Sequence, residues 1–193
     1  LFRSAGVGCF GFKQNGYECI ATCELLKERL IVQRANNKCR LDSGYICGDM
    51  TKEDTKNRLF EEIQRWHDEF NIQDVDVVFA TPPCQGMSTA NCKKTDQEQV
   101  RNSLVVAAIS GIRDVNPKVF IFENVRSFMK TTCTDISGVD MPIKESIFSN
   151  LSENYYIYYK VLNFKDYGVP SSRPRTIVVG TRRDLRNVSP LNI

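Results

Sequence analysis

One short stretch of the sequence is suited to covalent chemistry. Cys84 follows Pro82 and Pro83, which themselves follow the apolar run of residues 75–80. Each proline fixes φ, lacks an amide donor and pushes the preceding residue toward extended geometry, so the chain leaves the predicted strand stiffly. This rigid presentation favours a nucleophile at Cys84, because a thiolate is strongly nucleophilic. The alternative is a cysteine that only fills the core, since free cysteines are among the most buried residues.

Three carboxylates occupy comparable positions elsewhere in the chain. Glu24, Asp49 and Glu123 each stand at or just after the end of an apolar run. Carboxylates in such places bind polar groups of a ligand and stabilise charge. Simpler explanations stay open. These are a helix N-terminal acid for Glu24, a Gly-Asp turn for Asp49 and a strand-end carboxylate bonded to backbone amides for Glu123.

Two arginines near the end of the chain form a further candidate pair. Arg173 and Arg175 directly precede the apolar run of residues 176–180. Side chains two apart on a strand point to the same face, which favours joint action on one ligand. The alternative is a pair of solvated surface arginines.

These residues need a scaffold, and the sequence alternates strand and helix patterns. Predicted strands cover residues 17–23, 45–47, 75–80, 119–122, 155–162 and 176–180. Predicted helices cover residues 25–35, 53–70, 104–115 and 143–151, whereas residues 131–140 are polar and turn-like. The alternation indicates an α/β fold with a mostly parallel sheet and helices on both faces. In such a sheet ligands bind beyond the strand carboxyl ends, where Gly6, Glu24, Asp49, Cys84 and Glu123 are expected.

Two of the predicted helices carry apolar stripes that should face the core. The stripes are Leu25, Leu26, Leu30 and Ile31 in the first helix, and Leu59, Phe60, Ile63, Trp66 and Phe70 in the second.

Composition limits the class of protein. The 193 residues suffice for one compact domain, and the net charge of +3 gives no strong nucleic-acid footprint, although a local basic patch stays possible. The eight cysteines come without a signal peptide or a long apolar segment, so we expect reduced thiols in an intracellular protein. A metal site is not expected, because Cys19 and Cys23 are separated by three residues and His67 is the one histidine.

Taken in order, the motifs resemble a known enzyme family. They are Phe2 with Ala5-Gly6, Pro82-Pro83-Cys84-Gln85, Glu123-Asn124-Val125, Tyr167-Gly168-Val169-Pro170 and Arg173-Pro174-Arg175. Together they resemble the DNA cytosine methyltransferases that make 5-methylcytosine, and the resemblance covers nearly the whole chain. It implies the Rossmann-like fold of S-adenosylmethionine-dependent methyltransferases, with one catalytic domain over residues 1–193.

The resemblance implies S-adenosylmethionine as cofactor and double-stranded DNA as partner, with no membrane. By position, the cofactor contacts fall on Phe2, Ala5, Gly6, Glu24, Asp49 and Pro82. In this family an acid at the position of Glu24 holds the ribose hydroxyls, and one at the position of Asp49 lies near the adenine.

The resemblance also implies the catalytic residues. Cys84 would add to carbon 6 of the cytosine, and Glu123 would contact ring nitrogen 3 and the exocyclic amine. Arg173 and Arg175 would anchor the carbonyl oxygen of the base. The target base must leave the duplex stack to react, and the polar residues 85–99 suit a lid that closes over DNA.

Departures and rival functions stay open. Ser4 and Val7 stand where the family often has glycine, and Ser171 stands where glutamine is usual. We expect a chain truncated at both ends, with target recognition supplied by a second chain or a missing segment. The expected setting is a bacterial modification system acting in the cytoplasm, at the nucleoid. The rivals are an RNA (tRNA) cytosine methyltransferase, a catalytically silent nucleic-acid-binding relative and a dinucleotide-dependent oxidoreductase, although the glycines do not follow Gly-x-Gly-x-x-Gly.

Overall fold

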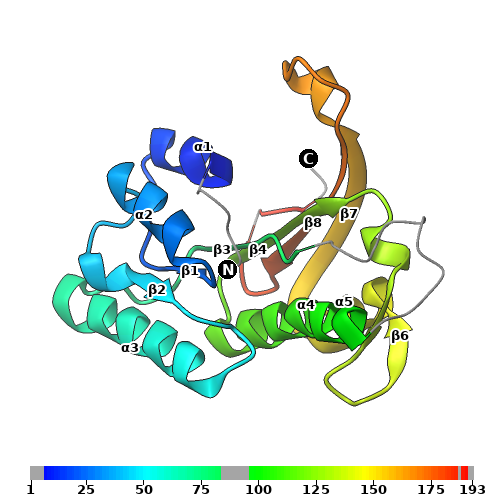
Figure 1. The fold of residues 1–193 in the computed structure, drawn as a ribbon, viewed down its shortest axis with the longest axis horizontal. Coiled ribbons are helices and arrows are strands. Elements are labelled where there is room, and N and C mark those ends of the chain that lie inside the picture. Colours follow the sequence, from blue (N-terminus) through cyan, green and yellow to red (C-terminus); the bar gives the residue numbers. More distant parts are fainter. Residues whose placement is uncertain (1–6, 84–95, 187, 191–193) are drawn as a thin grey trace. The chain divides into compact units, whose positions relative to one another are not determined.

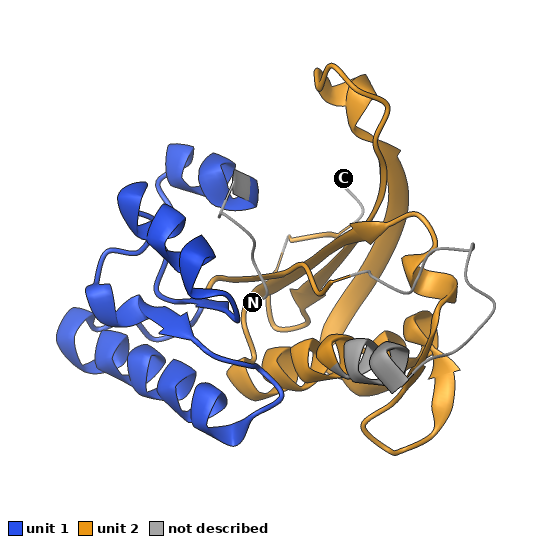
Figure 2. Ribbon diagram, in the orientation of Figure 1, with its two compact units in different colours: residues 1–75 blue, residues 76–193 orange. Residues whose placement is uncertain are grey.

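A computed structural model describes residues 7–83, 96–186 and 188–190 of the chain. These residues form two compact units, residues 1–75 and residues 76–193, which are described separately below (Figure 2). The α-helices are α1 (Phe10–Gln14), α2 (Lys27–Ala35), α3 (Glu53–Phe70), α4 (Asp96–Val115) and α5 (Ile143–Leu151). The strands are β1 (Thr22–Glu24), β2 (Tyr45–Cys47), β3 (Val77–Ala80), β4 (Val119–Val125), β5 (Thr132–Thr134), β6 (Asp140–Pro142), β7 (Tyr155–Asn163) and β8 (Pro174–Arg182).

The first unit is built on the parallel pair β1–β2 (Figure 1). The register places Glu24 opposite Cys47, so the two strands end at the same edge. Helix α3 has the predicted bounds and ends at Asn71, whose left-handed φ of 53° is a common helix stop. A buried cluster of Cys23, Ile46, Met50 and Leu59 joins this helix to the strands.

The apolar stripes of the first unit are only partly as predicted. Helix α2 begins at Lys27, and Leu25, Leu26 and Ile31 are 62%, 45% and 57% exposed. Leu30 is buried as expected, together with Gln33, which accepts a hydrogen bond from the Thr22 hydroxyl at 2.8 Å. Leu25 and Leu26 lie outside the helical stripe because the helix starts late, and Leu26 keeps an extended ψ of 117°.

Two other predictions in this unit were wrong. In α3 the side chain of Phe60 is 36% exposed, because it lies off the stripe on which Leu59 and Trp66 are buried. The predicted strand over residues 17–23 is shortened to Thr22–Glu24, preceded by an isolated bridge between Cys19 and Cys39.

The second unit contains a four-stranded sheet in the order β3-β4-β8-β7. Strands β3 and β4 are parallel, whereas β8 runs antiparallel to both β4 and β7. The α/β fold class is therefore confirmed with a partly parallel sheet, and among the described strands only the pairs β1–β2 and β3–β4 are parallel. Residues 164–173 connect β7 to β8, and this connection is shorter than the crossover that a parallel pair of neighbouring strands needs, so the two strands run antiparallel.

Strand β4 is one of the two inner strands of this sheet and extends three residues beyond its predicted end. Alternate side chains are buried, and Phe120, Phe122 and Asn124 share the buried face. Pairing with β8 keeps the last residues extended, since Glu123 lies opposite Ile177 and Val125 opposite Arg175. Glu123 therefore projects from the face opposite to Asn124.

The hairpin β7–β8 extends past the end of β4 (Figure 1). Its turn contains a 3-10 helix, η4 (Phe164–Tyr167), and Gly168 with a positive φ of 86°. The Asn163 side chain holds the two sides together, because its Oδ1 accepts from the Arg173 amide at 2.9 Å and its Nδ2 donates to Ser172 at 3.1 Å.

The polar residues 131–140, predicted as turn-like, instead contain one strand and the start of another, β5 and β6, which pair antiparallel. Asp135, 7% exposed, anchors their turn. Its carboxylate accepts hydrogen bonds from Ser137, Ser146 and Asn150. Burial alone would raise the pKa of this carboxyl, but the hydrogen bonds outweigh it and lower the pKa to about 2.

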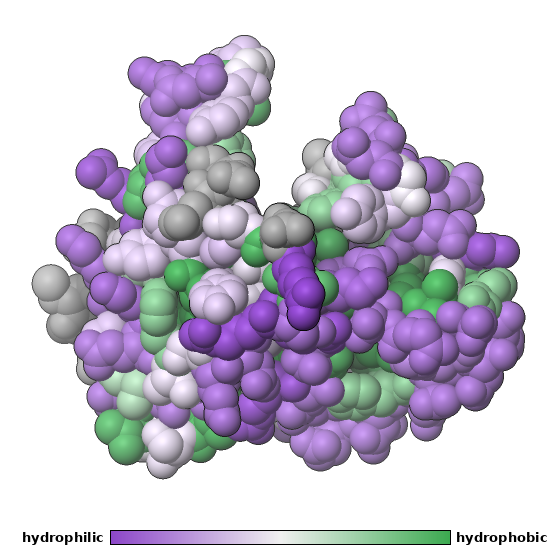
Figure 3. Space-filling model, turned by 180° about the vertical axis from the view of Figure 1, so that it is seen from behind, coloured by the Kyte–Doolittle hydropathy of each residue, from purple (hydrophilic) through white to green (hydrophobic). Residues whose placement is uncertain are grey.

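The face drawn in Figure 3 is mostly hydrophilic, and hydrophobic residues there form small separate groups. Among the described helices, none is both long and apolar enough to span a bilayer.

Gly180 is expected to tolerate no side chain. It lies opposite Phe120 in β4, and a Cβ atom there would overlap the fully buried Phe120 ring. Gly180→Ala should lower the free energy of unfolding by about 1 to 3 kcal/mol or more, because the packed ring must move. Denaturant titration measures this change in the free energy of unfolding. Gly11→Ala is the control, since nothing lies within 4 Å of its Cβ position. Equal loss in both variants would contradict the packing account.

Asp135 is expected to make stability pH-dependent in the acid range. Its pKa is lowered from 3.8 to about 2 in the folded protein, so its contribution is complete above the unfolded pKa and is lost as the pH falls toward 2. The size is roughly 2 kcal/mol. In Asp135→Asn the free energy of unfolding should depend less on pH between about pH 5 and pH 2 than in the wild type. Equal pH dependence of the unfolding free energy in the two proteins would contradict this role of Asp135.

Candidate active site

The carboxyl ends of β3 and β4 are joined by one side chain. Regular pairing of these strands ends with Ala80 opposite Phe122. Beyond it, the Nδ2 of Asn124 donates to the carbonyl oxygen of Pro82 at 3.0 Å. The Oδ1 of Asn124 accepts from the Val125 amide at 2.8 Å. The buried Pro82 is thus tied to β4 just before the position of Cys84.

Glu123 and Arg175 form an ion pair at the same edge. The Nε of Arg175 lies 3.0 Å from Oε1 of Glu123, and the two side chains are only 17% and 22% exposed. Arg175 reaches this edge because β8 runs antiparallel to β4, so its first residues lie beside the last residues of β4. A second bond, from Nη1 of Arg175 to the carbonyl of Pro174 at 2.9 Å, also fixes the guanidinium.

The structure brings Arg175, but not Arg173, to Glu123. Strand β8 begins at Pro174, so Arg173 precedes it and its side chain is exposed. The expectation that both arginines share one strand face was therefore wrong. The cause lies in the Arg173 backbone, whose amide donates to Asn163 and whose carbonyl accepts from Phe164 at 3.2 Å. These bonds belong to the turn of the hairpin.

Cys84 lies outside the described residues, as do Phe2, Ala5, Gly6 and residues 85–95 of the expected lid. Helix α4 begins at Asp96, inside the segment predicted to be a lid. Three described cysteines are poor nucleophiles. Burial raises the pKa of Cys23 to about 11 and raises that of Cys133, while a hydrogen bond with Cys19, followed by burial, raises that of Cys39.

In the first unit, Glu24 bonds to the start of α2. Its side chain is 7% exposed, and Oε1 accepts from the amides of Leu25 at 3.0 Å and Leu26 at 3.3 Å. Arg29 approaches both oxygens, at 3.4 and 3.5 Å. The simpler explanation of a helix N-terminal acid therefore describes its contacts here. Oε2 keeps acceptor capacity for a hydroxyl ligand, because a carboxylate oxygen accepts two bonds.

Asp49 stands at the same edge, two residues after β2. Its Oδ1 accepts from the amide and the hydroxyl of Thr51, both at 2.9 Å, which is the geometry of a polar turn. Gly48, before it, donates its amide to the Glu24 carbonyl at 3.1 Å. Glu24 and Asp49 are thus placed together at one strand edge, and their remaining oxygens fit a ligand rich in hydroxyl and amine groups.

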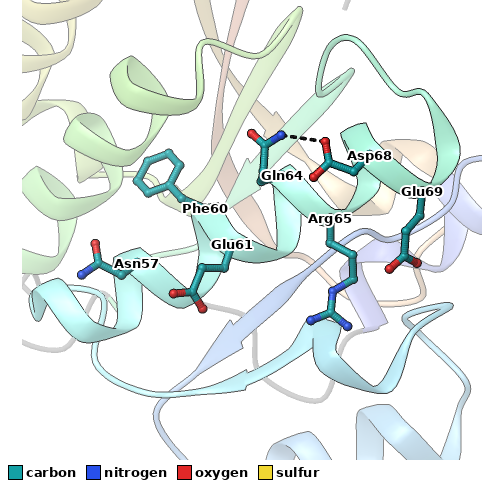
Figure 4. Close-up of a pocket in the computed structure, with 7 residues that line it drawn as sticks. All are labelled: Asn57, Phe60, Glu61, Gln64, Arg65, Asp68 and Glu69. Atoms are coloured by element: carbon teal, nitrogen blue, oxygen red, sulfur yellow. Dashed lines mark hydrogen bonds between the residues drawn. The ribbon is translucent and has the colours of Figure 1, made fainter.

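A further feature of the described surface lies along α3. A depression along α3 is lined by seven residues of that helix (Figure 4): Asn57, Phe60, Glu61, Gln64, Arg65, Asp68 and Glu69. Helical spacing explains this grouping, and Gln64 already donates to Asp68 at 2.9 Å. Within the described ranges, no three histidine, cysteine or acidic side chains are grouped as metal ligands.

Comparison with known proteins identifies the family. The model for C-5 cytosine-specific DNA methylases matches residues 1–192. The chain belongs to this family. It is 30% identical over 185 residues to the Type II methyltransferase M1.HgaI of Avibacterium volantium, covering 92% of this chain and 48% of that protein. It is 31% identical over 192 residues to the Type II methyltransferase M.DdeI of Desulfomicrobium norvegicum, covering 100% and 41%.

A solved structure shares the fold of this methylase family member. The S. pombe Dnmt2 methyltransferase matches with a TM-score of 0.64 at 13% identity, over 97% of this chain and 50% of that one. The likeness supports the S-adenosylmethionine-dependent methyltransferase fold. The chain spans about half the length of the relatives that it matches.

Sequence reasoning assigned no role to three residues that contact the candidate residues of one unit or the other. Arg29 pairs with Glu24, Thr176 donates to the carbonyls at the end of β4, and Asn124 holds Pro82. Asn124 gave a usable signal, because an amide side chain is disfavoured within an otherwise apolar strand. The other two depend on contacts between separate elements, which spacing does not reveal.

The Glu123–Arg175 pair is expected to contribute to stability. Both side chains are largely buried, so a double-mutant cycle with Glu123→Gln and Arg175→Gln should give a coupling free energy of about 1 to 3 kcal/mol in unfolding. The Asp76–Lys118 pair, at 2.8 Å but 57% and 38% exposed, is the control. Its coupling should stay below about 1 kcal/mol. Equal coupling in the two cycles would contradict this difference.

Proposed function

We propose that the protein containing this chain transfers a methyl group from S-adenosylmethionine to carbon 5 of cytosine in double-stranded DNA. One observation carries the proposal. At a single sheet edge, the Glu123–Arg175 pair lies beside the strand end that leads through Pro82 to Cys84. Family membership supports the same chemistry.

The reaction requires a nucleophile, because carbon 5 of cytosine is itself a poor one. The Cys84 thiolate adds to carbon 6, and the electron pair of the double bond moves to carbon 5. S-adenosylmethionine, when bound, would supply the electrophilic methyl group to carbon 5 and would leave as S-adenosylhomocysteine. A base then removes the proton from carbon 5, and elimination of Cys84 restores the double bond. Cysteine suits both steps, since it attacks strongly and leaves readily.

Glu123 and Arg175 act on the pyrimidine ring during these steps. We assign Glu123 to ring nitrogen 3 and the exocyclic amine, where its carboxyl group accepts from the amine and, in its protonated form, donates to nitrogen 3 and so stabilises the negative charge that the ring acquires. Arg175 holds that carboxyl group in place through its Nε and anchors the carbonyl oxygen of the base. The low exposure of the pair strengthens these interactions, since electrostatic forces grow where water is excluded.

We also propose the residues that contact the cofactor. Glu24 would bind the ribose hydroxyls through its less used Oε2, and Asp49 would lie near the adenine. Phe2, Ala5, Gly6 and Pro82 complete the proposed set. The contacts of Glu24 and Asp49 leave acceptor oxygens for such a ligand, so the donor set fits it.

The base must be flipped out of the duplex to react. The exposed Arg126 follows the end of β4 and the exposed Arg173 precedes the start of β8, where both suit contacts with DNA phosphates. We propose that a second chain, or a segment outside this one, supplies target recognition. As in a bacterial modification system, the enzyme would act in the cytoplasm on nucleoid DNA.

Covalent trapping tests the proposal. With duplex DNA carrying 5-fluorocytosine and S-adenosylmethionine, the intact protein should form an adduct that survives denaturation, because fluorine blocks the final proton loss. Cys84→Ser should reduce adduct formation by at least about 1000-fold, since a hydroxyl is a far weaker nucleophile at neutral pH.

The matched control is Cys47→Ser, because Cys47 is exposed and lies in β2. It should trap DNA like the wild type. Transfer to tRNA but not to duplex DNA would favour the RNA-modifying alternative. No adduct on either substrate would favour a silent nucleic-acid-binding relative.

A further inference from the structure

Asn124 has no part in the reaction described so far, yet burying its polar side chain costs free energy of desolvation. Its side chain is 3% exposed and lies on the buried face of β4 with Phe120 and Phe122. A buried amide is tolerated only when its polar atoms are bonded. Both are bonded here, since Nδ2 donates to Pro82 and Oδ1 accepts from Val125.

The bond to the Pro82 carbonyl links the two strand ends beyond the backbone ladder of β3 and β4. The ladder between β3 and β4 ends at Ala80 opposite Phe122, and neither Pro82 nor Pro83 has an N–H with which to extend it. The Asn124 amide reaches across at this point and binds the Pro82 carbonyl. Pro83, with its fixed φ, is then the one residue between this anchor and Cys84.

We infer that Asn124 is a positioning residue, which sets where the segment bearing Cys84 leaves the sheet relative to Glu123. This inference rests on the proposed function. Asn124 and Glu123 are neighbours whose side chains point to opposite faces of one strand. One dipeptide therefore fixes both the carboxylate that holds the base and the backbone that presents the nucleophile. Thr176 keeps this strand end in place by donating to the carbonyls of Val125 and Arg126 at 3.1 and 3.2 Å.

Asn124→Asp tests the inference in the intact protein, because it keeps the shape and removes the donor while the carboxyl is ionised. Single-turnover adduct formation with 5-fluorocytosine duplex DNA should slow about 100-fold, the effect of a small misplacement of reacting groups. The dissociation constants for DNA and for S-adenosylmethionine should change less than about threefold.

The pH profile separates positioning from general damage. The carboxyl that Asn124→Asp introduces is buried, so its pKa should be raised, and its protonated form can again donate to the Pro82 carbonyl. The ratio of the wild-type rate to the Asn124→Asp rate should therefore narrow as the pH is lowered from about 8 to about 6. A purely structural defect would keep the ratio constant or widen it, and either result would overturn the inference.

Ser146→Ala is the matched control. It also removes a buried hydrogen bond in the same unit, the one to Asp135, but leaves Pro82 untouched. It should trap DNA at the wild-type rate. If Asn124→Asp does not fold, Asn124→Ser replaces it, since its hydroxyl is too short to reach Pro82 and the same slow trapping is expected.

A wild-type trapping rate in the folded Asn124 variant would overturn the inference. Cys84→Ser, assayed in parallel, reports on the proposed function separately. Full trapping by Cys84→Ser would refute the proposed nucleophile, whatever the Asn124 variants do.

Discussion

The candidate active site depends on the alternation of side chains along β4. This strand has a parallel neighbour on one side and an antiparallel neighbour on the other, so its backbone is held extended as far as Val125. Alternation then sends Phe120, Phe122 and Asn124 into the core and Glu123 to the opposite face. A shift of one residue in register would exchange the two sets. The apolar packing of the phenylalanines therefore also determines where the reactive carboxylate stands.

The antiparallel strand β8 supplies the second part of the site. Were β8 parallel to β4, its first residues would lie at the far edge of the sheet, and Arg175 could not reach Glu123. The resulting ion pair is mostly shielded from water. Shielding costs free energy of desolvation, and the close contact between Nε and Oε1 offsets this cost. The Arg175 side chain is in turn held by a hydrogen bond to the carbonyl of Pro174. The charge of Glu123 is thus oriented before any substrate arrives, as electrostatic preorganisation requires.

Much of this architecture could be predicted from the sequence because it depends on local patterns. Helices α3 and α5 and strand β2 have the predicted bounds, since each combines clear periodicity with distinct end signals. The placement of Glu24 and Asp49 at one edge could also be predicted, because each stands at or just after the carboxyl end of one of two parallel strands. The exposure of Leu25 and Leu26 could not be predicted, because it depends on the bonds from their amides to Glu24, which precede the helix start at Lys27. The direction of β8 and the exclusion of Arg173 depend likewise on the hairpin turn, where Asn163 bonds to the Arg173 backbone.

The central claim is that Glu123 and Asn124 together position the base and the nucleophile-bearing segment. The most direct measurement is a crystal structure of the intact protein covalently trapped on 5-fluorocytosine duplex DNA. The account predicts a bond from Cys84 Sγ to carbon 6, with Glu123 on ring nitrogen 3 and Arg175 still beside it. It also predicts that Asn124 Nδ2 stays within hydrogen-bond distance of the Pro82 carbonyl, as it is at 3.0 Å here. A trapped complex in which that bond is broken, or in which the base lies away from Glu123, would contradict the account.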